Sequence, residues 1–305
     1  MTKTPIFLVS QPRAGSTMTQ LVLSNSNQVS TASEPWIQFF LAGLEKSLAR
    51  KALNNRDRSF KALFEFLQPK PEEHRKQLLR NITDLLYDDG SLAKYFLDKT
   101  PRYYLFLDEL KAVFPQAKFI ILKRDPEAVF HSIVNTWHAE SSVRKITKVH
   151  YEDLFVAPKL LQDFLDKHST CKNVYSLQYE ATVNDPINTF QNLYSFLNLD
   201  FKPELLNYSR NKKLQGTLGD PTGIQRSSTP QKGTQQTNLK RNHAKMLDVY
   251  LASLGHDFLD QYGYKNKHYK NRKKLSNKIN SYGKSSTSRN DLKSEIFATI
   301  KYYCS

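Results

Sequence analysis

"PIFLVSQPRAGSTMTQL" (residues 5–21) joins a short apolar run to an amphipathic run through a compact loop. The apolar run 5–10 predicts a strand buried on both faces, and the apolar spacing from Thr17 onward predicts a helix. In parallel sheets, ligands bind beyond the carboxyl ends of the strands, and the free amides of a helix's first turn bind anions. The loop "QPRAGSTM" (11–18) is therefore a candidate anion site between a strand and a helix.

Three further apolar runs resemble the first, and each is followed by a helical pattern. Two of the following helices begin with Asp-Pro, at Asp125 and Asp185, where the Asp can cap the helix and the Pro fills its first turn. Strands that alternate with helices predict an α/β fold, with a P-loop-like central parallel sheet flanked by helices. The three runs are residues 94–99, 118–123 and 173–178.

Four segments lie outside this alternation. Helical spacing in a polar sequence over about residues 37–90 predicts a helical insertion. Residues 209–243 are rich in Gly, Pro, Ser, Thr and Gln and predict a long loop, and residues 244–263 predict one more helix. We expect a single domain, residues 1–264, followed by a basic, mobile tail, residues 265–305.

The composition bounds the class of protein. A chain of 305 residues that is 39% hydrophobic suits one large domain, and its formal net charge of +16 predicts an anionic ligand, surface or polymer. Residues 265–295 hold ten Lys and Arg but two Asp and Glu, which is half of that net charge. We expect this tail to be solvated and mobile or to contact an anionic surface peripherally, and we expect no specific nucleic-acid binding.

Cys171 and Cys304 are the only cysteines, too few for a disulfide framework, which favours a reducing compartment. The first strand begins by residue 5 and leaves no room for a signal peptide. No run of 18 or more apolar residues predicts a transmembrane helix. These patterns predict a soluble cytoplasmic protein.

The residue types of the loop suit a phosphate. Gly15 lets the backbone close around an oxyanion, the hydroxyls of Ser16 and Thr17 add donors, and Arg13 adds a planar cation. An ATP-binding loop of the form G-x-x-x-x-G-K-[ST] is not present, because this loop has one Gly and no Lys beside it. A simple turn with a helix cap is the alternative interpretation of the loop taken alone.

A second candidate anion site lies in "FIILKRDPEAVFHS" (residues 119–132). Arg124 falls at the carboxyl end of a predicted strand, and Ser132 lies about two helical turns further on. The two side chains can therefore face the same side of the sheet edge and hold a second phosphate. The alternative is an Arg124–Asp125 salt bridge with Ser132 as an ordinary helix residue.

Together the two motifs resemble those of the sulfotransferase superfamily, which uses 3'-phosphoadenosine 5'-phosphosulfate (PAPS). The family's 5'-phosphosulfate loop, P-[KR]-S-G-T-T, is matched by "PRAGST" (12–17). Its 3'-phosphate motif, Arg-Asp-Pro with a Ser eight positions after the Arg, is matched from Arg124 to Ser132. Further similar stretches are "FLDKTPRYY" (96–104), "LQYEATVNDPINTFQNLYSFLNLDF" (177–201) and "GDPTGI" (219–224).

The resemblance implies roles for the residues around the donor. It places Arg13 and Lys99 near the transferring sulfuryl group and makes Arg124 and Ser132 the clamp on the 3'-phosphate. The 5'-phosphate cradle would be Ala14, Gly15, Ser16 and Thr17, with Ala14 standing where Ser is usual and Ser16 where Thr is usual.

An adenine-side contact is implied less completely. The family's R-K-G pattern is matched only in part by "QKG" (231–233), which makes Lys232 a candidate contact. The motifs are closest to the bacterial-type members and to the glycan and protein-tyrosine branch, where a Lys equivalent in motif to Lys99 lies near the bridging oxygen.

Sulfuryl transfer to a hydroxyl needs a base, and Glu34 is the candidate. It follows a predicted short strand, "QVSTAS" (28–33), and the Pro after it favours an extended backbone. Its position also resembles the base of the glycan and protein-tyrosine branch. A surface Glu is the alternative interpretation, and His131 or His138 could replace it as the base, as in small-molecule sulfotransferases.

The sequence thus predicts an enzyme that moves a sulfuryl group from PAPS to a hydroxyl or amine, with a carbohydrate or small metabolite as acceptor and without a metal. Two alternatives remain open. A nucleotide kinase or NTPase would use the same loop for ATP, and a non-catalytic protein would bind an anionic ligand without needing Glu34 or Lys99.

Overall fold

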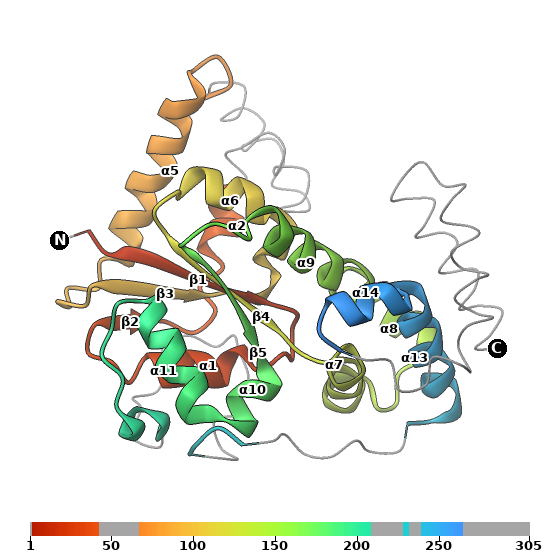
Figure 1. The fold of residues 1–305 in the computed structure, drawn as a ribbon. Coiled ribbons are helices and arrows are strands. Elements are labelled where there is room, and N and C mark those ends of the chain that lie inside the picture. The colour runs from red at the N-terminus through yellow and green to blue at the C-terminus, as the bar shows by residue number, and fades with distance from the viewer. Residues whose placement is uncertain (1, 43–66, 209–227, 232–238, 265–305) are drawn as a thin grey trace.

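The computed structural model describes residues 2–42, 67–208, 228–231 and 239–264. At its centre lies a five-stranded parallel sheet with strand order β2-β3-β1-β4-β5, which confirms the predicted α/β fold (Figure 1). The strands are β1 (Thr4–Ser10), β2 (Val29–Thr31), β3 (Tyr95–Lys99), β4 (Lys118–Lys123) and β5 (Val174–Gln178).

Helices occupy most of the described chain between the strands. The α-helices are α1 (Ser16–Leu23), α2 (Ile37–Ala42), α5 (Glu72–Tyr87), α6 (Leu107–Val113), α7 (Pro126–Ile133), α8 (Val143–Tyr151), α9 (Ala157–Lys167), α10 (Tyr179–Asn184), α11 (Pro186–Phe196), α13 (Arg241–Leu254) and α14 (His256–Gln261). Short 3-10 helices are η1 (Pro101–Phe106) and η4 (Pro203–Leu206), and π-helical turns are η2 (Val134–His138) and η3 (Glu152–Val156).

The parallel register brings the candidate site residues to one edge of the sheet. β1 lies in the middle and pairs with β3, where Leu8 lies opposite Lys99, and with β4, where Ser10 lies opposite Leu122. The loops that follow β1, β3 and β4 therefore leave the sheet side by side. This is the edge at which ligands bind in open parallel sheets.

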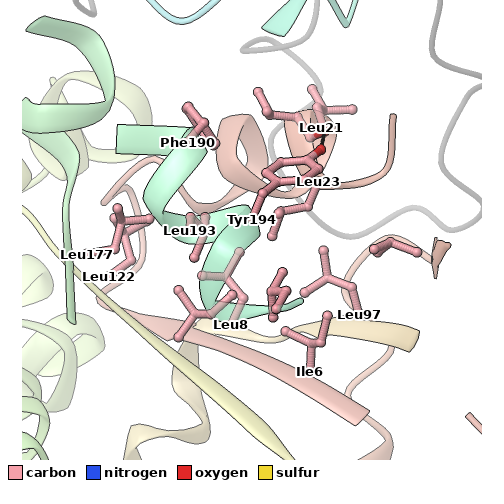
Figure 2. Close-up of a cluster of buried hydrophobic side chains, with 14 of the residues drawn as sticks. Ile6, Leu8, Leu21, Leu23, Leu97, Leu122, Leu177, Phe190, Leu193 and Tyr194 are labelled. Atoms are coloured by element: carbon pink, nitrogen blue, oxygen red, sulfur yellow. Dashed lines mark hydrogen bonds between the residues drawn. The ribbon is translucent and has the colours of Figure 1, made fainter. Parts of the chain in front are cut away.

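Alternate residues of β1 enter two different apolar layers, because side chains alternate across a strand. Ile6 and Leu8 pack with α1 and α11 on one face, and Tyr194 of α11 donates a hydrogen bond to the Val22 carbonyl at 2.8 Å (Figure 2). Phe7 and Val9 pack on the other face with η1, α6 and α9. Truncating one such buried side chain to Ala costs about 2–5 kcal/mol, so these layers hold the strand ends in place.

A third apolar layer lies beyond β4 and is built from α7, η2, α8, η3, α13 and α14. The sequence predicted one helix over residues 244–263, which is wrong. Two helices occupy this region, because Gly255 with φ 87° separates α13 from α14. α13 also begins at Arg241, inside the predicted loop 209–243.

The helical insertion predicted over residues 37–90 is described in part, as α2 and α5. Gln38 of α2 connects these helices to the sheet. Its main-chain N–H donates to Tyr103 Oη at 2.9 Å, and its side-chain Nε2 donates to Tyr87 Oη at 3.2 Å. Both tyrosine hydroxyls donate to the carboxylate of Asp98, at 2.6 Å and 3.0 Å. Burial raises the pKa of Asp98 to about 6, although the hydrogen bonds of these hydroxyls oppose the shift.

Several predicted features lie outside the described residues. They are the middle of the insertion (43–66), the "GDPTGI" stretch, Lys232 and the basic tail (265–305). Within the described ranges, none of the helices combines the length and the apolar character needed to cross a bilayer.

Candidate active site

The loop between β1 and α1 is held in an unusual backbone conformation. Arg13 has φ 69° and Gly15 has φ 95°, both in the left-handed region, and α1 begins directly afterwards at Ser16. Ala14 stands where the family's loop pattern has Ser. It is fully buried in the apolar layer formed with α1 and α11, so its methyl group packs in the core. The loop therefore presents the first amides of α1 at the sheet edge, as an anion site requires.

Tyr179 closes over the loop from the end of β5. A Cβ atom on Gly15 would lie only 2.5 Å from Cδ2 of the Tyr179 ring, so position 15 has no room for a side chain. The same ring faces Arg124, whose Cζ lies 4.2 Å from the ring centroid in a cation–π contact. One aromatic side chain thus contacts both predicted phosphate motifs.

Gly15→Ala is expected to destabilise the protein by about 1–3 kcal/mol and to weaken binding of 3'-phosphoadenosine 5'-phosphate (PAP), because the new methyl group displaces the Tyr179 ring. Thermal melts with and without PAP measure both effects. Gly90→Ala is a matched control, since Gly90 also has a positive φ, 74°, but has no atom within 4 Å of the added Cβ. Equal losses in the two variants would contradict the role of the Tyr179 contact.

The structure brings the two predicted phosphate motifs into direct contact. Arg13 Nε donates a hydrogen bond to Ser132 Oγ at 3.3 Å, and an Arg124 terminal nitrogen donates to the Arg13 carbonyl at 2.8 Å. Arg124 Nε is buried and has no hydrogen-bond partner among the described residues. Two guanidinium groups, a hydroxyl and an unsatisfied buried N–H form a donor set that fits an anionic group such as a phosphate.

A second group joins β3 to the segment after β2. Lys99 Nζ donates to Glu34 Oε1 at 2.8 Å and lies 3.5 Å from Thr17 Oγ1 in the β1–α1 loop. The Lys99 side chain is 1% exposed and that of Glu34 is 17% exposed. The ammonium group, the carboxylate and the loop hydroxyl predicted to act together are therefore neighbours at the sheet edge.

The two candidate histidines differ in their surroundings, because His138 is hydrogen-bonded to other side chains and His131 is half-buried. His138 Nε2 lies 2.8 Å from His150 Nε2 and its Nδ1 lies 3.0 Å from Ser141 Oγ, while His131 Nδ1 is buried without a hydrogen-bond partner in the described part of the chain. Burial lowers the pKa of both histidines. Among the described residues, no group of three or more His, Cys, Asp and Glu is arranged to hold a metal ion.

Sequence reasoning missed a buried ion cluster next to these groups. Arg102 of η1 binds Asp153 of η3 with two hydrogen bonds, Nε to Oδ1 at 2.9 Å and a terminal nitrogen to Oδ2 at 2.8 Å. His150 Nδ1 lies 2.8 Å from the same Oδ2, and Tyr104 Oη donates to Oδ1 at 2.7 Å. Arg102 stands in the quoted stretch "FLDKTPRYY", but its partner lies 51 residues away, where no local pattern points to it.

Two indole rings flank this cluster. Trp137 stacks on His150 with ring centroids 5.4 Å apart and lies 5.5 Å from Arg13 Cζ, and Trp36 lies 5.9 Å from Arg102 Cζ. The two aromatic side chains therefore connect the cluster to the β1–α1 loop, through Trp137 and Arg13, and to Glu34, through Trp36.

Asp153→Asn is expected to destabilise the protein by about 1.5–3 kcal/mol at pH 7, because the half-buried Arg102 loses its ionic partner and the buried side chain at position 153 loses its charge. Burial alone would raise the pKa of Asp153, but the hydrogen bonds from His150, Arg102 and Tyr104 and the charge of Arg102 lower it to about 2. The Asp153 carboxylate therefore contributes its full stabilisation at pH values above the pKa of an Asp in the unfolded chain, which is about 4. This contribution is lost as the pH falls towards 2, the pKa of Asp153 in the folded protein.

Urea unfolding at several pH values measures this effect. The difference in unfolding free energy between wild type and Asp153→Asn is expected to shrink as the pH falls from 4 to 2. Asp200→Asn, at an exposed position, is the control. A difference that stays constant over this pH range would show that the Asp153 charge does not stabilise the fold.

Comparison with known proteins identifies the family. The sequence profile of the sulfotransferase family matches residues 5–203. The nodulation protein NoeE of Sinorhizobium fredii is 28% identical over 139 residues, which are 43% of this chain and 31% of that protein. A putative protein-tyrosine sulfotransferase of Caenorhabditis briggsae is 27% identical over 137 residues, 42% of this chain and 45% of that protein.

The matched region thus spans less than half the length of either relative. Among solved structures, the sulfotransferase domain from the curacin biosynthetic pathway superposes with a TM-score of 0.56 at 18% identity, covering 87% of this chain and 99% of that domain. This similarity shows that the chain and the curacin-pathway domain share the same fold. The profile match over residues 5–203 establishes that the chain belongs to the sulfotransferase family, as the sequence predicted.

Proposed function

We propose that this chain transfers a sulfuryl group from PAPS to a hydroxyl or amine of an acceptor and releases PAP. The observation that carries the proposal is the contact of the two phosphate motifs, in which Arg13 reaches Ser132 and Arg124 reaches the Arg13 carbonyl. Residues 13–17 would hold the 5' end of the donor, and Arg124 with Ser132 would hold its 3'-phosphate. Lys232 remains a proposed adenine contact.

In this proposal Glu34 is the general base. The acceptor oxygen attacks sulfur as its proton moves to the Glu34 carboxylate, and the bond from sulfur to the bridging phosphate oxygen breaks. Arg13 and Lys99 stabilise the negative charge on the sulfuryl oxygens and on the departing phosphate, because cations positioned at developing charge lower the barrier. The 2.8 Å contact between Lys99 and Glu34 supports a shared role at one reacting centre.

We propose a carbohydrate or small hydroxylated metabolite as the acceptor. A carboxylate base with a neighbouring Lys resembles the glycan and protein-tyrosine branch, and relatives of this chain include a nodulation protein and a putative protein-tyrosine sulfotransferase. We also propose action in the cytoplasm, which the scarcity of cysteines supports, and peripheral contact of the basic tail with an anionic surface.

The experiment is a transfer assay with ³⁵S-labelled PAPS against separate panels of glycans, phenols, lipids and amines. The proposal predicts that label moves to a hydroxylated carbohydrate or metabolite without added metal. Label transfer confined to lipids or phenols would overturn the proposed acceptor class but not the reaction. PAPS that remains intact with every panel, together with transfer of phosphate from ATP, would overturn the reaction itself.

A further inference from the structure

Trp36 has a strained backbone next to the proposed base. Its φ is 54°, in the left-handed region, where bulky residues are rarely found. Among the described residues, Arg13, Trp36 and Asn198 are the non-glycine residues with positive φ. Such strain costs about 1–3 kcal/mol and persists only where the surroundings impose it, so the packing around Trp36 must hold it in this conformation.

Packing against two elements holds the indole ring in place. Phe39 of α2 stacks on it, with ring centroids 4.9 Å apart and an angle of 26° between the planes. Phe39 in turn packs against Tyr103 and Phe106 of η1. On another side, the Arg102 guanidinium lies 5.9 Å from the indole centroid and is itself fixed by its two hydrogen bonds to Asp153.

The held ring directs its N–H at the Glu34 carboxylate. Trp36 Nε1 donates to Oε2 at 3.3 Å, while Lys99 Nζ donates to Oε1 at 2.8 Å. Each carboxylate oxygen therefore has its own donor, and the two donors come from different elements. Held at both oxygens, the carboxylate cannot rotate freely about its last torsion, which fixes the direction in which it accepts a proton.

We propose that Trp36 is a positioning residue for the reaction, whose indole N–H orients the Glu34 carboxylate towards the acceptor. This inference rests on the proposed role of Glu34 as the base. Neither the sequence pattern nor the family resemblance pointed to Trp36, since its role depends on a left-handed backbone and on packing against Phe39 and Arg102. Charged groups that face Glu34 include Lys99 on β3 and Arg102 on η1.

The first test is Trp36→Phe, which keeps an aromatic ring against Phe39 and removes the N–H. We expect kcat to fall roughly tenfold, as for the loss of one hydrogen bond to a charged group, while KM for PAPS and the thermal shift caused by PAP stay unchanged. A lower kcat at unchanged KM and unchanged PAP binding separates a positioning role from a merely structural one.

Trp137→Phe is the matched control. Trp137 is the other tryptophan of the chain, is 47% exposed and lies against Arg13 and His150, whereas the indole that donates to Glu34 is that of Trp36. Any effect of its replacement on kcat is expected to persist in the Glu34→Gln background, because Trp137 does not act through Glu34. A second replacement, β-(3-benzothienyl)alanine at position 36, substitutes sulfur for the N–H within a ring of nearly the same shape and removes any question of folding.

The outcomes separate this inference from the proposed function. If Glu34→Gln is inactive while both replacements at position 36 keep the wild-type kcat, the positioning role is overturned and the base remains. If the replacements lower kcat only in proportion to a loss of folded protein, Trp36 is structural and the inference fails. If Glu34→Gln is fully active, the proposed base itself fails. Addition of Trp36→Phe to Glu34→Gln is expected to cause no further loss of kcat.

Discussion

Glu34→Gln is expected to lower kcat by about 10²- to 10⁴-fold, the contribution typical of a positioned general base. The amide has nearly the same shape as the carboxylate, and its single oxygen can still accept one of the two hydrogen bonds that Trp36 Nε1 and Lys99 Nζ donate to Glu34. It cannot accept the proton of the acceptor. Steady-state rates with labelled PAPS measure the loss, and stabilisation by PAP is expected to persist because Glu34 belongs to neither phosphate motif.

Glu204→Gln is the control for this substitution, since Glu204 is exposed in η4 and lies outside the sheet edge. A variant Glu34→Gln with wild-type kcat would contradict the assignment of the base. His138→Gln would then be the next variant to measure, although the His138 ring nitrogens are already bonded to His150 and Ser141.

Arg124→Ala is expected to abolish the thermal shift caused by PAP and to raise KM for PAPS by at least roughly 100-fold. Two effects add in this variant. The 3'-phosphate loses charge-assisted hydrogen bonds worth about 1.5–3 kcal/mol each, and the Arg13 carbonyl loses the donor that lies 2.8 Å away. The strained loop around Arg13 and Gly15 then loses one of the contacts that hold it.

Arg144→Ala provides the matched control, because Arg144 is an exposed arginine on α8. The melting temperature without ligand separates the two effects, since loss of the loop contact lowers it and loss of the phosphate contact does not. An Arg124→Ala variant that PAP still stabilises as well as the wild type would contradict the placement of the 3'-phosphate.

The sequence predicted the sheet well because its strands β1, β3 and β4 are short apolar runs that are almost wholly buried, although β5 is more exposed than predicted. Each predicted strand is present, including the short one before Glu34, which is β2. The two Asp-Pro helix starts are confirmed as well, since Asp125 accepts a hydrogen bond from the Glu127 amide and Asp185 accepts one from the Asn188 amide. These features depend on residues close together in the chain, which a local pattern can reveal.

The features that the sequence did not reveal depend on distant residues or on a single backbone torsion. Gly255 ends α13 in an amphipathic run that otherwise continues to α14, because its φ of 87° does not fit a helix. Arg102 and Asp153 meet only because η1 and η3 pack together across the sheet edge. The left-handed conformation of Trp36 likewise has no signature in "SEPW", whose Pro indicated only that Glu34 would be extended.

In the candidate site, too, the sequence revealed the local motifs but not every contact between distant residues. The sequence placed Arg13, Arg124 and Ser132 in two motifs, and the parallel order of β1 and β4 explains why those motifs meet. Lys99 and Glu34 meet for the corresponding reason, because β3 lies between β1 and β2. The sequence contains no comparable motif for binding the acceptor. Residues 43–66 of the predicted insertion and residues 209–227 of the predicted loop lie outside the described residues.

The central claim is that the two joined motifs bind the two phosphates of a 3',5'-substituted adenosine nucleotide. Thermal melting of the full chain with PAP plus a chelator, and separately with ATP plus Mg²⁺, tests it most directly. A ligand that binds only the folded state stabilises it by about 2.7 kcal/mol at 100 times its Kd, a shift that a melt detects easily. We predict a clear rise in melting temperature with PAP despite the chelator, and a smaller one with ATP and Mg²⁺. A rise with ATP and Mg²⁺ and none with PAP would contradict the account.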